Sequence, residues 1–206
     1  MTAIDQVMRL GPVIPVLVVE DVAHARPIAE ALVEGGLRVL EVTLRTPAAL
    51  AVIREMAQVK GAIVGAGTVL NETDLKASLD AGAQFIVSPG LTRPLAEKAI
   101  ASVVPFLPGI QTASDIMRGL DLGLSRFKFF PAMAAGGIPA LKALAAPFHQ
   151  CRFCPTGGIT QESATDWLAL EAVPCVGGSW LVPAGKPALS AIAARAAKAY
   201  KELPSG

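Results

Sequence analysis

The stretch IAEALVEGGLRVLEVTLR, residues 28–45, joins a segment with helical periodicity to a short apolar run. The apolar side chains at positions 28, 31 and 32 would share one side of a helix, while Glu30 and Glu34 would face water. Residues 37–43 follow as a short run rich in Val and Leu, which is typical of a strand. The stretch therefore predicts a helix followed by a strand, each with an apolar face to bury.

Comparable units recur along the chain. Strand candidates rich in Val, Ile, Leu and Phe lie near residues 13–19, 37–43, 62–66, 84–88, 103–107, 126–130, 151–155 and 173–177. Ala- and Leu-rich segments with helical periodicity separate these runs, so that one unit takes about 20 to 26 residues. Eight such units closed in a ring predict an α/β fold, a single (β/α)8 TIM barrel with a short N-terminal helix, in one domain over residues 1–206. The alternative is an open doubly wound sheet, but no glycine loop follows the first strand.

Composition narrows the class of protein. The chain has 206 residues, of which 52% are hydrophobic and 17% charged, as in a compact globular protein. Eighteen basic and 17 acidic side chains nearly cancel, which argues against a nucleic-acid or membrane partner. No apolar run approaches the ~20 residues needed to span a bilayer, and the first residues show no signal-peptide pattern. We therefore expect a cytoplasmic protein.

Cysteine and histidine usage gives no indication of a metal site. Three cysteines suit a reducing compartment better than a disulfide framework. Cys151 and Cys154 form a CxxC on an expected strand, where side chains three apart point to opposite faces, so chelation is not expected. His24 falls in the first helical segment, and His149 precedes the seventh strand, away from the carboxyl ends where a barrel carries its site. We predict no metal and no cofactor.

The carboxyl ends of the strands supply the candidate site. In the second strand, Glu41, Thr43 and Arg45 share one face, which we expect to look into the barrel or its mouth. The alternative for Glu41 and Arg45 is a buried structural ion pair. Glu41 is the one carboxylate that the alternation places inside, where it could transfer protons.

Lys128 is the second chemical candidate. It lies within RFKFFP, residues 126–131, among aromatic neighbours. Burial disfavours the ammonium form, so such a lysine can become an amine nucleophile toward carbonyls. The alternative is an edge-strand lysine with its ammonium group in solvent.

Glycine-rich ends of other strands predict an anion site. The seventh and eighth strands end in PTGG (residues 155–158) and VGGS (residues 176–179), where barrels commonly bind phosphate through backbone N–H groups. The third strand ends in GAGT, residues 65–68; its glycines permit close backbone approach, but Leu70 breaks the GxGxxG fingerprint of nucleotide sites. Gly-Gly turns after adjacent strands together favour phosphate binding.

Six motifs in order resemble the class I aldolases of 2-keto-3-deoxy-6-phosphogluconate (KDPG) and 4-hydroxy-2-oxoglutarate (KHG). These motifs are EVTLRT (41–46), GAGTVLN (65–71), SPGLT (88–92), RFKFFPA (126–132), RFCPTGGI (152–159) and GGSWLVPA (177–184). The resemblance implies an Entner–Doudoroff aldolase that uses a Schiff base, needs no metal or other cofactor, and is typically a homotrimer. It implies that Lys128 forms the imine and that Glu41 is the general acid/base.

The same resemblance implies a set of substrate-binding residues. Arg45 and Thr68 match positions near the pyruvate carboxylate and the acid/base, and Phe130 packs beside the lysine. Thr156 matches a hydroxyl near the substrate chain. The remaining candidates are Pro89 for the substrate, and Gly157, Gly158, Gly178 and Ser179 for the phosphate.

The resemblance leaves two alternative substrates and one alternative function open. The C4 epimer derived from galactonate and unphosphorylated 4-hydroxy-2-oxoglutarate are alternative substrates, because a hydroxyl such as that of Thr156 or Ser179 does not establish stereochemistry. A phosphate-binding barrel without turnover is the alternative from another class. Met133 stands where many family members have an acid, which could alter the loop or a subunit contact.

Overall fold

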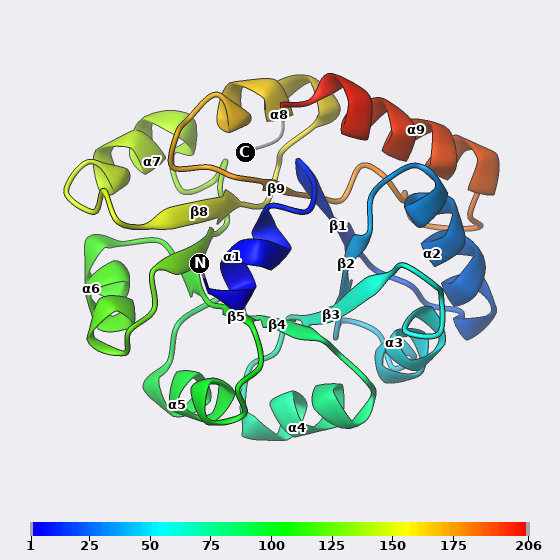
Figure 1. Cartoon of the computed structure of the whole chain (residues 1–206), viewed down its shortest axis with the longest axis horizontal. Coiled ribbons are helices and arrows are strands. Elements are labelled where there is room, and N and C mark those ends of the chain that lie inside the picture. The colour runs from blue at the N-terminus through cyan, green and yellow to red at the C-terminus, as the bar shows by residue number, and fades with distance from the viewer. Residues whose placement is uncertain (1, 205–206) are drawn as a thin grey trace.

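The computed structural model describes residues 2–204 and arranges helices around a centre of parallel strands (Figure 1). The strands are β1 (Val13–Leu17), β2 (Val39–Thr43), β3 (Ile63–Gly67), β4 (Phe85–Val87), β5 (Phe106–Leu107), β6 (Gly109–Ile110), β7 (Arg126–Phe129), β8 (Arg152–Pro155) and β9 (Val176–Gly178). Every predicted strand run thus overlaps a strand. Every pairing between these strands is parallel.

The helices alternate with the strands. They are α1 (Ala3–Met8), α2 (Ala25–Glu34), α3 (Ala49–Met56), α4 (Glu72–Asp80), α5 (Arg93–Ala101), α6 (Ala113–Asp121), α7 (Gly137–Ala145), α8 (Gln161–Leu168) and α9 (Leu189–Glu202), with a 3-10 turn, η1 (Val22–His24). Side-chain hydrogen bonds cap the start of α6. The Thr112 side chain accepts a hydrogen bond from the backbone N–H of Asp115, and the Asp115 carboxylate accepts one from the backbone N–H of Thr112. No helix within residues 2–204 is long and apolar enough to cross a membrane.

The predicted closed eight-stranded barrel is wrong. The strands form two separate sheets, one of six strands in the order β5-β4-β3-β2-β1-β9 and one of three in the order β6-β7-β8. Pro108, which directly follows the fifth predicted run and has no N–H to donate, separates β5 from an additional short strand, β6, so that β5 pairs with β4 while β6 pairs with β7. At the other gap, β8 and β9 are joined only by an isolated bridge between Thr156 and Gly177. Pro155 and Pro174 remove two further donors there.

Two apolar cores follow from this arrangement. The larger core lies between the strands and the surrounding helices and includes Leu40, Val42 and Phe127. The smaller core fills the space that the strands enclose, where Ile14, Phe85, Leu107 and other buried side chains meet α1. Because α1 covers the amino-terminal end of that space, the carboxyl ends of the strands remain for the site.

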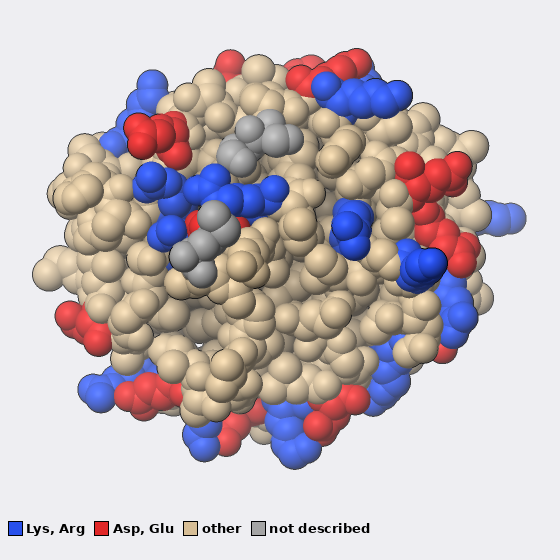
Figure 2. Space-filling model, viewed as in Figure 1, with Lys and Arg blue, Asp and Glu red and all other residues tan. Residues whose placement is uncertain are grey.

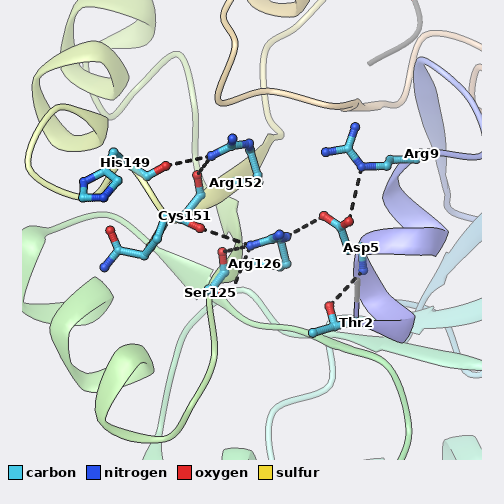
Figure 3. A network of polar contacts seen from close by, with 9 residues as sticks. Thr2, Asp5, Arg9, Ser125, Arg126, His149, Cys151 and Arg152 are labelled. Carbon is cyan, nitrogen blue, oxygen red and sulfur yellow. Dashed lines mark hydrogen bonds and ion pairs between the residues drawn. The ribbon is translucent and has the colours of Figure 1, made fainter.

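An ion network fastens α1 at that end. The Asp5 carboxylate is buried, and its Oδ1 lies 2.6 Å from Nε of Arg126, while its Oδ2 lies 3.3 Å from Nε of Arg9. Figure 3 shows Asp5 between the two guanidinium groups, and Figure 2 shows basic side chains gathered beside α1 in the view of Figure 1. Arg126 begins β7, so the network joins α1 to the strand that carries Lys128.

Candidate functional site

Lys128 and Glu41 form an ion pair inside the protein. Nζ of Lys128 lies 3.0 Å from Oε1 of Glu41, and the two side chains are 7% and 4% exposed. Because β7 and β2 belong to different sheets, the pair spans the space between them. The alternative of an edge lysine with its head in solvent is therefore wrong.

The surroundings of this pair are apolar on the lysine side. Nζ of Lys128 lies 5.3 Å from the centroid of the Phe130 ring, which is within cation–π range. Phe127 and Phe129 are fully buried on the opposite face of β7. A carboxylate at 3.0 Å is within direct hydrogen-bonding reach, so a proton can pass between the two groups. After such a transfer the Lys128 amine could attack a carbonyl, and the Glu41 carboxyl group would hold the proton.

Thr43 and Arg45, which the sequence predicts on the same face as Glu41, have different surroundings in the structure. Thr43 is buried, and its hydroxyl donates to the carbonyl of Leu17 at 2.9 Å, which ties β2 to β1. Arg45 lies in the turn after β2, where it is exposed and has no hydrogen bond or ion pair with another residue that the structure describes. The alternative of a buried Glu41–Arg45 ion pair is wrong, because Glu41 pairs with Lys128 instead.

Thr68 and Pro89 follow the ends of β3 and β4. Thr68 is half-buried and has a φ of +60°, a backbone conformation that is unusual for a β-branched residue. Pro89 is half-buried, and a side chain added at Gly109 would collide with its backbone. Gly109 is the residue that pairs in register with Lys128, so Pro89 lies close to the lysine strand.

The two glycine-rich strand ends lie side by side. The bridge between Thr156 and Gly177 aligns them, and Thr156 is buried while Gly158 is exposed. Gly157 and Gly158 have φ values of +106° and +77°, so both positions favour glycine. After the second end, Gly178 is buried against the Trp180 ring, while Ser179 is exposed. Such exposed backbone at two neighbouring turns suits an anion.

Met133 lies against the first glycine turn. Its backbone N–H donates to the carbonyl of Gly157 at 3.1 Å, and a side chain at Gly158 would collide with its Cβ and Cγ atoms. The Met133 residue is 52% exposed. Met133, which stands where the family pattern often has an acid, thus borders the candidate phosphate site.

The cysteines are buried free thiols. Contact with Cys154 and burial raise the pKa of the Cys175 thiol well above its usual value. Cys154 contacts Thr156, with 3.9 Å between Sγ and Oγ1. Within residues 2–204, no group of three or more His, Cys, Asp or Glu side chains is placed to hold a metal ion.

The sequence predicts candidate site residues but not the contacts between them. The glycines of GAGT indicate only that something approaches the backbone closely. In the structure, Gly67 lies against the Glu41 side chain, and Gly65 lies against the Phe85 ring. No periodicity or motif in one sequence shows which neighbour occupies such a space.

Known proteins are similar to this chain in both sequence and structure. Residues 4–194 match the family described as KDPG and KHG aldolase. The structure of the 2-keto-3-deoxy-6-phosphogluconate aldolase of Zymomonas mobilis ZM4 with 3-phosphoglycerate is 60% identical, with a TM-score of 0.95, over 97% of this chain and 95% of that one. The KHG/KDPG aldolase of Escherichia coli K12 is 56% identical over 89% of this chain and 86% of its own.

A third relative is a KDPG aldolase from Legionella pneumophila, whose crystal structure has pyruvate captured as a covalent carbinolamine intermediate. It is 43% identical, with a TM-score of 0.93, over 97% of this chain and 99% of that one.

Proposed function

Because this chain belongs to the KDPG and KHG aldolase family, we propose that it cleaves its substrate through an imine formed on Lys128. The protein is a carbon–carbon lyase, and its reaction is the cleavage of 2-dehydro-3-deoxy-6-phosphogluconate to pyruvate and glyceraldehyde 3-phosphate in the Entner–Doudoroff pathway. The observation that carries the proposal is the buried contact of 3.0 Å between Lys128 and Glu41.

The reaction begins with the amine of Lys128. It attacks the C2 ketone to give a carbinolamine, and loss of water gives an imine whose protonated nitrogen accepts electrons. Glu41 removes the proton of the C4 hydroxyl, the C3–C4 bond breaks, and its electron pair moves toward the nitrogen to form an enamine. The C4 carbonyl leaves as glyceraldehyde 3-phosphate. Protonation of the enamine at C3 and hydrolysis of the imine release pyruvate and restore the amine.

The remaining candidates bind the two ends of the substrate. Arg45 orients the keto-acid carboxylate through a charge-assisted hydrogen bond, which its exposed position without a protein partner among the described residues supports. Thr68, Pro89 and Phe130 contact the pyruvate part. The Thr156 hydroxyl lies near the substrate chain. The phosphate end is held by Gly157, Gly158, Gly178 and Ser179, and the aligned ends of β8 and β9 support that assignment. Binding energy at the phosphate then helps to position the bond that breaks.

Steady-state kinetics on purified protein test the substrate. We expect kcat/KM to be highest for the phosphogluconate-derived substrate, because the glycine turns bind its phosphate. The second candidate is 4-hydroxy-2-oxoglutarate, which the name of the 56% identical Escherichia coli relative favours. The galactonate-derived C4 epimer is the third compound in the assay. A kcat/KM for the unphosphorylated acid equal to that for KDPG would refute a phosphate site at the glycine turns.

Three further features stay predictions. We propose a single catalytic domain over residues 1–206, a homotrimer in solution and a cytoplasmic location. Multi-angle light scattering distinguishes a trimer from a monomer.

A further inference from the structure

We propose that Gly67 is a positioning residue, whose missing side chain provides the space that holds the Glu41 carboxylate against Lys128. The inference rests on the proposed role of Glu41 as the proton acceptor, and it adds a residue that acts only through the position of the Glu41 side chain. It concerns the inward face of β3, where the backbone approaches the ion pair.

The geometry places Gly67 directly beside the carboxylate. Glu41 pairs in register with Gly65, and Gly67 is the next residue of β3 on the same face. A Cβ atom at Gly67 would collide with Oε1 of Glu41, and it would lie 2.7 Å from Cγ and 2.8 Å from Cδ. Its three nearest atoms thus all belong to one side chain, that of Glu41. Oε1 is also the atom that contacts Nζ of Lys128.

Backbone conformation does not explain a glycine at this position. Gly67 is not among the residues with positive φ, so an alanine could adopt its backbone angles without strain. The remaining reason for a glycine at position 67 is the space that the Glu41 side chain occupies. Because Cγ and Cδ would collide as well as Oε1, rotation of the terminal carboxylate alone would not relieve the contact. The Glu41 side chain as a whole would move, and its hydrogen bond to Lys128 would lengthen or break.

Gly65 supplies a matched control on the same strand and face. A Cβ atom there would collide with the Phe85 ring, which belongs to the apolar core beneath the ion pair. The two positions therefore separate two consequences of the same substitution. Gly65→Ala disturbs core packing, whereas Gly67→Ala disturbs the proton acceptor.

The test is a double-mutant cycle between positions 67 and 41. Gly67→Ala alone is expected to lower kcat about 100-fold, since a displacement of about 1 Å at a reacting group costs roughly that factor. In a Glu41→Ala background the same substitution meets no carboxylate, and kcat is expected to change by less than about twofold. An equal loss of kcat in both backgrounds would overturn the inference, since the methyl group would then act through something other than Glu41.

Two more measurements keep the inference separate from the proposed function. If Glu41→Gln turns over slowly while Gly67→Ala has wild-type kcat, the positioning role fails and the role of Glu41 stands. If Glu41→Gln has wild-type kcat, the role of Glu41 fails, and the inference fails with it. Should Gly67→Ala not fold, the thermal midpoint of Gly67→Ala/Glu41→Ala decides: we expect it to equal or exceed that of Glu41→Ala, and a lower midpoint would overturn the inference.

Discussion

Replacement of Asp5 by asparagine tests whether the ion network at α1 stabilises the fold. The Asp5 side chain is 3% exposed, and its carboxylate lies 2.6 Å from Arg126 and 3.3 Å from Arg9. Removal of one partner from a buried ion pair costs about 3–5 kcal/mol. Arg126 is 18% exposed and also donates to two oxygens of Ser125 and to the carbonyl of Gln150, so its charge keeps other partners. We therefore expect a loss of about 2–3 kcal/mol in the free energy of unfolding.

The pH dependence of this loss follows from the pKa of Asp5. Burial alone would raise that pKa, but hydrogen bonds and charges from Arg126 and Arg9 outweigh burial and hold it below its ordinary value of 3.8. A carboxyl with a lowered pKa in the folded state stabilises the protein above its unfolded pKa, and this stabilisation is lost as the pH falls through the folded value. The difference between wild type and Asp5→Asn should therefore be constant near neutral pH and shrink below about pH 4.

Urea unfolding at one protein concentration between pH 3 and 7 measures both the loss of stability in Asp5→Asn and its pH dependence. The expected loss corresponds to a fall of about 4–12 °C in thermal midpoint for a chain of this size. Asp166→Asn on α8 is the control, because Asp166 is exposed and forms no ion pair with a described residue. A loss below about 0.5 kcal/mol for Asp5→Asn, the range of ordinary surface substitutions, would refute the reasoning, as would a difference that does not shrink in acid.

The remaining predictions concern the site and one helix start. Glu41→Gln should lower kcat about 10²- to 10⁴-fold while imine formation with pyruvate survives, and rapid-quench kinetics separate the two steps; an unchanged kcat would remove Glu41 from its role. Arg45→Gln should raise KM about tenfold to 100-fold with little change in kcat, because a charge-assisted hydrogen bond to the carboxylate contributes about 1.5–3 kcal/mol. A change confined to kcat would contradict that assignment. Thr112→Ala should lower the free energy of unfolding by about 1 kcal/mol by removing the cap of α6, as urea unfolding would show; equal stability would mean that the cap is dispensable.

The alternation of strands and helices was predictable from sequence, because apolar periodicity depends on neighbours within each segment. The division into two sheets was not. Pro108 directly follows the fifth predicted run, but its effect on hydrogen bonding depends on which strands flank it. The single bridge between Thr156 and Gly177 likewise depends on register, which no motif encodes.

The candidate site, too, was only partly predictable from the sequence. Alternation placed Glu41 on the inward face of its strand, and the structure buries it there. Its partner could not be read from one strand, because Lys128 is 87 residues away in the chain and lies in the other sheet. Arg45, which alternation placed on the same face as Glu41, lies beyond the end of β2, where the strand pattern no longer applies.

Borohydride trapping with pyruvate tests directly whether the imine forms on Lys128. The reductant converts an imine to a stable secondary amine, and peptide mass spectrometry locates the added mass. We expect the adduct to form on Lys128, and we expect a folded Lys128→Arg variant to give none. An unmodified Lys128 beside a labelled lysine elsewhere, such as Lys142, or trapping that persists in Lys128→Arg, would contradict it.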